Sequence, residues 1–184
     1  MGSHALLSAS SSKRWIECPP SARMCERYDD RGSDYAAEGT EAHALCEYLL
    51  KNALGMEASD PRPTFSHYSE EMLECAENYV AYALEIIARI RETCPDPQIL
   101  IEQKLNFSEY VPGGYGTGDL LIVGDGTLYV CDYKHGTGVL VEAVGNPQLR
   151  LYGLGSLLLF DGIYDIETVS MTIFQPRRGS VSTE

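Results

Sequence analysis

Two aspartates and one lysine are spaced so that they can form a divalent-metal site. A strand predicted over Thr127–Lys134 places Asp132 and Lys134 on the same face, because alternate side chains of a strand point the same way. Asp119 lies in the preceding predicted strand, Gly116–Gly124, and an Asp-Gly pair between the two strands predicts a hairpin. Carboxylates on neighbouring strands beside a lysine offer the hard oxygen ligands that Mg²⁺ or Mn²⁺ prefers.

Further polar residues are candidates for the same site. Gln148 and Tyr152 are four residues apart and therefore share one face of a predicted helix. His43 lies in another predicted helix, where a lone histidine is more often structural unless a ligand set requires it. Each of these residues alone is compatible with an ordinary structural role, and only their combination indicates a functional site.

Hydrophobic periodicity predicts the elements that must position these residues. The predicted helices cover residues 13–18, 21–30, 35–54, 69–93 and 146–160, and the predicted strands cover residues 99–105, 116–124, 127–134 and 167–176. This order indicates a mixed central β-sheet flanked by helices, in the α/β (α+β) class. A length of 184 residues suits a single domain, 1–184. Because no element is predicted after Pro176, we expect the chain to be a C-terminally truncated piece of a longer protein.

The charge of the chain argues against a simple nucleic-acid-binding protein. The net charge is −13, whereas phosphate binding normally needs a basic surface. Carboxylates gathered around a metal ion account for part of this acidity. Basic residues are concentrated near the start of the chain: Lys13, Arg14, Arg23, Arg27 and Arg31.

Composition also bears on the compartment. No run of about 18 apolar residues is present, and the first residues lack the basic start and long apolar stretch of a secretory signal. None of the six cysteines forms a C-x-x-C pair, which favours reduced, buried thiols over a zinc site. We therefore expect a cytoplasmic protein with no membrane association.

The spacing D-x(12)-D-Y-K, formed by Asp119, Asp132 and Lys134, resembles the core motif of the PD-(D/E)XK nuclease superfamily. Four further strings resemble motifs of its RecB-like exonuclease branch, which includes phage and CRISPR-associated (Cas4-like) nucleases. These are EGTEAH at residues 38–43, the strand with Glu102, GTGDLLI at residues 116–122, and QLRLY at residues 148–152. The opening SASSSKRWIECPPSAR resembles the start of a prophage-encoded subgroup.

This resemblance implies a restriction-endonuclease-like core and a metal-dependent deoxyribonuclease. It implies that Mg²⁺ or Mn²⁺ is held by His43, Asp119, Asp132 and the main-chain carbonyl of Tyr133, with Glu102 joining directly or through water. The metal would lower the pKa of a bound water and polarise the phosphoryl group. Lys134 would orient that water or stabilise charge on the phosphate.

The resemblance also implies roles and partners beyond the metal. Gln148 and Tyr152 would contact the DNA backbone or the active site. The expected activity is exonucleolytic hydrolysis of linear DNA in phage recombination or DNA processing, with DNA and a phage recombination protein as partners. Some relatives form oligomers. Others carry an iron–sulfur cluster, but no cysteine follows Cys131 here, so we expect no cluster on this chain.

Three alternatives remain open. A non-catalytic relative of the same fold would bind DNA or a recombinase, although such relatives tend to lose the Asp-x-Lys set. A nucleotide-binding protein could use the glycines of residues 113–118 as a phosphate loop, but a strand rather than a helix follows them. A phage structural or assembly protein is also compatible with the composition.

Overall fold

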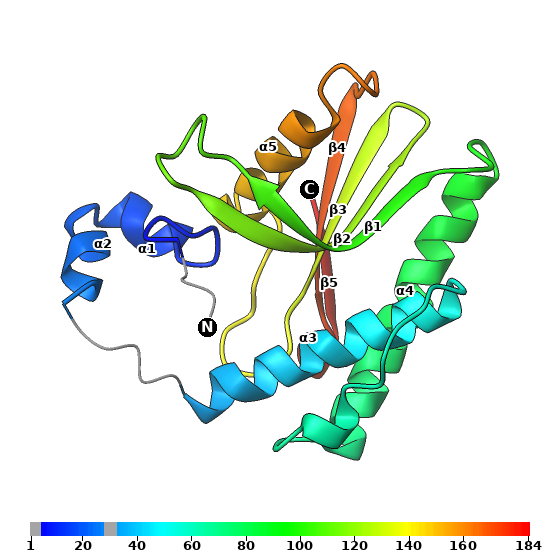
Figure 1. Ribbon diagram of the computed structural model, residues 1–184, viewed down its shortest axis with the longest axis horizontal. Helices are drawn as coiled ribbons and strands as arrows, with labels where there is room; N and C mark the ends of the chain where they lie inside the picture. Colours follow the sequence, from blue (N-terminus) through cyan, green and yellow to red (C-terminus); the bar gives the residue numbers. More distant parts are fainter. Residues whose placement is uncertain (1–4, 28–32) are drawn as a thin grey trace.

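The computed structural model describes residues 5–27 and 33–184, and a five-stranded mixed sheet lies at its centre (Figure 1). The strands are β1 (Gln98–Asn106), β2 (Tyr115–Gly124), β3 (Thr127–Tyr133), β4 (Thr168–Gln175) and β5 (Ser180–Thr183). They follow one another across the sheet in chain order. The β3–β4 pair is parallel and the other pairs are antiparallel. The prediction of a mixed sheet flanked by helices is thus confirmed.

Helices cover both faces of this sheet. The α-helices are α1 (Ser12–Glu17), α2 (Pro20–Cys25), α3 (Asp34–Ala53), α4 (Glu70–Arg91) and α5 (Pro147–Phe160). Helices α3 and α4 form one buried cluster with side chains such as Leu120 and Cys131, whereas α5 forms a second cluster on the other face with Leu121 and Val130. Figure 1 shows α1 and α2 beside the far end of the β1–β2 hairpin.

Side chains at the helix starts explain where the long helices begin. The hydroxyls of Ser33 and Ser69 accept hydrogen bonds from backbone N–H groups in the first turns of α3 and α4. The Asn146 side chain does the same for α5, and Pro147 occupies its first position. These caps fix the starting points of the helices that carry His43 and Gln148.

The predicted hairpin between β2 and β3 is confirmed. Asp125 and Gly126 have φ angles of 51° and 69°, the left-handed conformation that a tight two-residue turn of this kind needs. The turn sets the register in which Leu120 faces Cys131, and so brings the next residues, Asp119 and Asp132, to neighbouring positions.

One prediction about the sheet was wrong. Residues after Pro176 do not lack structure, because a short 3-10 helix, Pro176–Arg178, leads into β5, which pairs with β4. Strand β5 contains small polar residues in an alternation too short to stand out in the sequence. A further 3-10 helix, Arg62–Thr64, lies between α3 and α4. The last part of the helix predicted over 21–30 and Arg31 fall outside the described residues.

The structure also tests the expectation of reduced, buried cysteines. All six thiols are free; Cys46, Cys75 and Cys131 are buried, Cys94 is half-buried, and Cys18 and Cys25 are exposed, contrary to the expectation for these two.

Among the helices of residues 5–27 and 33–184, none combines the length and the apolar character needed to cross a bilayer.

Candidate metal centre

One pocket contains all the side chains that the sequence suggested. It is lined by His43, Glu102, Asp119, Asp132, Lys134, Gln148 and Tyr152, together with residues of the N-terminal segment and of β2. These seven side chains come from α3, β1, β2, the end of β3 and α5. Segments far apart in the sequence therefore converge at one end of the sheet.

Three of these residues make the tightest group of donor atoms. The ligand atoms of His43, Glu102 and Asp119 all lie within 4.8 Å of one another. His43 Nδ1 lies 3.3 Å from Asp119 Oδ1 and 3.9 Å from Glu102 Oε1. An imidazole and two carboxylates at this separation form a donor set suited to Mn²⁺ or Mg²⁺.

Asp132 belongs to the adjacent part of the pocket. Its Oδ2 lies 2.8 Å from Lys134 Nζ, and its Oδ1 accepts a hydrogen bond of 3.2 Å from Gln148 Nε2. Gln148 also accepts a 3.0 Å hydrogen bond from Lys134 Nζ through Oε1 and donates to the Tyr152 hydroxyl at 3.0 Å. The sequence thus identified a connected polar cluster, although Asp132 lies outside the three-residue donor group.

The backbone at Glu102 has an unusual conformation. Its φ of 51° lies in the left-handed region that non-glycine residues rarely adopt. The β1–β2 register pairs Ile101 with Leu120 and Gln103 with Gly118, so Glu102 lies across from Asp119 at the position where the ladder is interrupted. A strained residue held at this point presents its carboxylate to the pocket, a pattern typical of functional sites.

Several ionisable groups lie close together in the pocket and are partly shielded from solvent, which shifts their pKa values. Burial lowers the pKa of His43, but Asp119, Asp132 and Glu102 outweigh it and raise that pKa to about 9. Burial and then the charge of Asp119 raise the pKa of Glu102 to about 7. Burial opposes ionisation of Asp119 as well, but the His43 imidazolium lowers the pKa of that carboxyl below its usual value. A cation is therefore favoured at this position.

Tyr133 connects the donor group to the protein behind it. Its backbone N–H donates a 2.6 Å hydrogen bond to Asp119 Oδ2, and its ring contacts the His43 ring edge-on at 5.4 Å between centroids. The sequence implied only its main-chain carbonyl as a ligand, and that role stays a prediction. The side chain of Tyr133 is fully buried and acts here as packing for His43.

Sequence reasoning missed a layer of charged residues around Tyr133. The Tyr133 hydroxyl lies 2.8 Å from His135 Nδ1, and His135 Nε2 lies 3.4 Å from Glu38 Oε1. Arg177 then donates to Glu38 at 3.0 Å and makes two hydrogen bonds to Glu71. These residues occur up to 139 positions apart, and of them only Glu38, the first residue of the EGTEAH string, belongs to a motif described above.

Comparison with known families gives one match to report. Residues 4–184 match a family model described as "Protein of unknown function (DUF2800)". The match covers nearly the whole chain, whereas its description supplies no activity. The geometry of the pocket is therefore what indicates a function.

Proposed function

The chain belongs to the DUF2800 family, and we propose that it is a divalent-metal-dependent deoxyribonuclease of the PD-(D/E)XK type. The observation that carries this proposal is the meeting of Asp119 and Asp132, from neighbouring strands, with Lys134 and His43 in one pocket. Separate motifs of the sequence suggested each of these residues. Their convergence in space is what a shared catalytic role requires.

The arrangement of the elements supports the assignment to this superfamily. An antiparallel hairpin, β2–β3, carries the two aspartates, and a parallel strand, β4, lies beside β3. Helix α5 crosses the face on which Asp132 and Lys134 lie, and α3 brings His43 from the other direction. This is the mixed sheet with flanking helices that the resemblance implies.

The residues present fit a divalent cation. His43, Glu102 and Asp119 would supply one nitrogen and two carboxylates as ligands. Asp132 lines the same pocket and would add a third carboxylate. Among the described residues, Asp132 Oδ2 has no hydrogen-bond partner although the atom is buried, and its contact is the ion pair with Lys134. A bound Mg²⁺ or Mn²⁺ would supply Lewis-acid activation of water and of the phosphate.

The protein side chains have separable roles in this reaction. The Lys134 ammonium, 2.8 Å from Asp132, places a positive charge where the phosphate gains negative charge, so we propose charge stabilisation as its main role. Gln148 holds both members of that ion pair through its amide. Tyr152 fixes the Gln148 amide in turn, and is a positioning residue.

The experiment that tests this function measures loss of end-labelled linear DNA and of closed-circular DNA with Mn²⁺, Mg²⁺ or EDTA. We expect metal-dependent loss of the linear DNA alone, which would identify an exonuclease, and we expect Asp132→Ala to abolish it. Asp165→Ala, a matched change at an exposed residue away from the pocket, should keep full activity. No loss with any metal, for folded wild-type protein, would refute the nuclease and favour a non-catalytic DNA-binding relative.

A further inference from the structure

The N-terminal segment forms one wall of the candidate metal centre. Ala5, Ser8, Ala9 and Ser10 line the same pocket as Asp119 and Lys134. Ser10 is exposed, whereas Ala9 is buried against the protein. A substrate bound at Lys134 would therefore lie beside this segment.

Hydrogen bonds hold this segment in a defined conformation. Trp15 Nε1 donates to the Ser8 carbonyl at 2.9 Å, and the Ser8 and Ser11 hydroxyls are 2.8 Å apart. The buried Ser12 donates its N–H to the Ala9 carbonyl at 3.0 Å. The wall is thus preformed, which lowers the entropic cost of binding a ligand against it.

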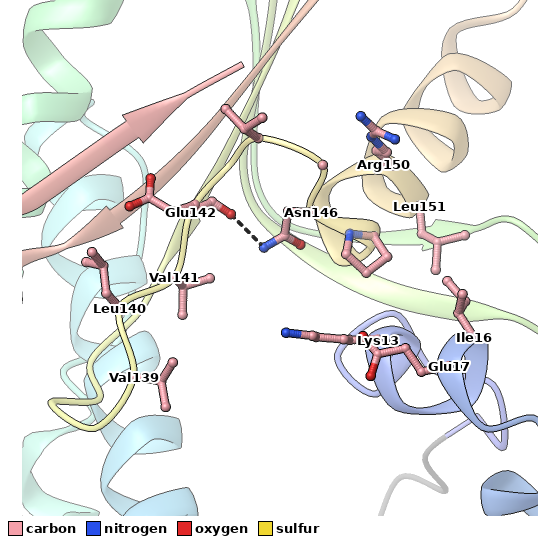
Figure 2. A pocket seen from close by; sticks show the side chains of 13 residues that line it. Lys13, Ile16, Glu17, Val139, Leu140, Val141, Glu142, Asn146, Arg150 and Leu151 are labelled. Carbon is pink, nitrogen blue, oxygen red and sulfur yellow. Dashed lines mark hydrogen bonds between the residues drawn. The ribbon is translucent and has the colours of Figure 1, made fainter.

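Two further hollows lie beside α1. Ser8 and Ser10 also line a hollow of about 400 Å³ that contains Arg14. On the other side of α1, a hollow of about 780 Å³ lies between α1, the loop before α5 and the start of α5 (Figure 2). The smaller hollow shares Ser8 and Ser10 with the metal centre, whereas the larger one reaches α5 at Pro147, the residue before Gln148.

Charge distinguishes this part of the chain from the rest. In residues 5–27, the cations Lys13, Arg14, Arg23 and Arg27 outnumber the acids Glu17 and Glu26, whereas the whole chain has a net charge of −13. None of these four cations forms an ion pair with another described residue. The cations that do are Lys51, Arg62, Arg89, Lys134, Arg150 and Arg177. Two of them, Lys13 and Arg14, line the two hollows and leave positive charge available there for an anionic ligand.

The larger hollow adds an apolar surface to these charges. Figure 2 shows the Lys13 side chain extending across it, with Ile16 and Leu151 on its walls. Val144, 70% exposed, and Val139, 78% exposed, lie on the loop that forms the opposite wall. Sites for single-stranded nucleic acid combine cations along the strand backbone with side chains, usually aromatic, on which bases stack. This hollow offers a base aliphatic rather than aromatic contact.

We infer that α1 and the segment before it hold a single DNA strand across the metal centre. Ser10 and Arg14 contact its phosphates on one side of the cleaved bond, and the hollow beside Lys13 accepts an unstacked base on the other side. This inference rests on the proposed nuclease function and adds the part of the chain that selects the substrate.

The test is binding of a fluorescein-labelled single-stranded oligonucleotide of about 15 nucleotides to the full chain in EDTA over a range of salt concentrations. We expect Lys13→Gln with Arg14→Gln to weaken binding about tenfold near 0.1 M salt and to reduce the salt slope by roughly one to two. The matched control, Arg89→Gln with Arg91→Gln, removes the same charge from the exposed end of α4 and should leave binding unchanged.

A second pair of variants tests the apolar hollow. Val144→Glu should weaken strand binding, whereas Ile163→Glu, at a residue of nearly equal exposure (69%), should not. If a variant and its control weaken strand binding equally, the inference is wrong. It is also wrong if the wild type binds no strand and instead selectively captures a protein partner. If the Lys13/Arg14 variant hydrolyses DNA with the wild-type KM, the inference about α1 is wrong but the proposed nuclease function stands. If the wild type binds the strand but hydrolyses no DNA with any metal, the proposed function is wrong.

Discussion

The Tyr133 hydroxyl lies 2.8 Å from His135 Nδ1, and both side chains are buried directly behind the candidate metal centre. His135 faces Glu38 at 3.4 Å, and Glu38 lies on α3, the helix that also carries His43. Because the Tyr133 ring packs edge-on against His43, this chain of contacts holds the imidazole from behind. Such outer contacts orient a ligand before a metal binds.

Tyr133→Phe should therefore weaken Mn²⁺ binding about tenfold, as measured by titration calorimetry. The change removes the hydroxyl, leaves His135 without that partner and loosens the ring against His43. Unfolding free energy in EDTA should fall by only about 1 kcal/mol, the typical value of one hydrogen bond.

Tyr79→Phe is the matched control for this prediction. Tyr79 is also buried, its ring contacts Tyr133 at 5.3 Å, and its hydroxyl has no hydrogen-bond partner among the described residues. Its loss should leave Mn²⁺ affinity unchanged. If both variants reduce Mn²⁺ affinity to the same extent, Tyr133 has no specific positioning role.

Glu102→Gln should make the metal-free protein more stable at alkaline pH. Burial and Asp119 raise the pKa of Glu102 to about 7 in the folded state, against 4.5 in the unfolded chain. Its contribution to stability is therefore fully present below pH 4.5 and is lost as pH rises through about 7. The neutral amide avoids that loss, so thermal unfolding in EDTA should show a gain of about 1–3 kcal/mol at pH 8 and none at pH 4.5.

The same variant should bind Mn²⁺ more weakly, because an amide replaces a charged ligand of the donor group. Glu109→Gln, at an exposed loop residue, serves as the control and should change neither property. A Glu102→Gln variant that is less stable than the wild type at pH 8 would contradict the assigned burial of this carboxylate.

Metal binding at pH 7 should release about one proton from His43. The pKa of His43 is raised to about 9 by Asp119 and its acidic neighbours against the opposing effect of burial, so the ring is protonated before a metal arrives. A metal ligand must be a neutral imidazole. Calorimetry in buffers of different ionisation enthalpy measures this release.

His43→Asn should reduce the proton release by about one per metal ion, whereas His67→Asn should leave it unchanged, since His67 lies outside the pocket and pairs with Glu41. The raised pKa of His43 also affects stability, because the contribution of the protonated ring to folding is present below pH 6.5 and is lost as pH rises through about 9. Release that is the same in wild type and His43→Asn would exclude His43 as a ligand.

The sequence was sufficient for the parts of the site that depend on local rules. Strand alternation places Asp132 and Lys134 on one face, and the Asp125-Gly126 turn brings Asp119 beside them, which the structure reproduces. These features depend on the period of a strand and on φ angles that two residues adopt by themselves.

Other parts of the site depend on contacts between distant segments. The contact of Glu38 with Arg177 joins residues 139 positions apart, and no periodicity marks either of them. The left-handed conformation of Glu102 arises from its place in the sheet, because an ordinary glutamate disfavours it. No sequence pattern indicates that Ser8 and Ser10 line the pocket, because the packing of Ala9 against the protein brings them there.

Gly116→Ala should disturb the packing that places the N-terminal segment at the pocket. A Cβ atom at Gly116 would lie 2.7 Å from Tyr152 Cε1 and 3.3 Å from Ala9 Cβ. Since neither the ring nor the buried alanine is the far end of a flexible chain, the segment or the ring must move. We expect unfolding free energy to fall by about 1–3 kcal/mol and DNA hydrolysis to fall further, because Tyr152 holds Gln148.

Gly136→Ala is the matched control, since a Cβ there meets nothing within 4 Å. It should leave hydrolysis and stability close to wild type, as measured by chemical denaturation and by the linear-DNA assay. If Gly116→Ala is as stable and as active as Gly136→Ala, then the N-terminal segment does not pack against β2 and Tyr152 in solution. The wall of the metal centre, and with it the proposed path of the DNA strand, would then be wrong.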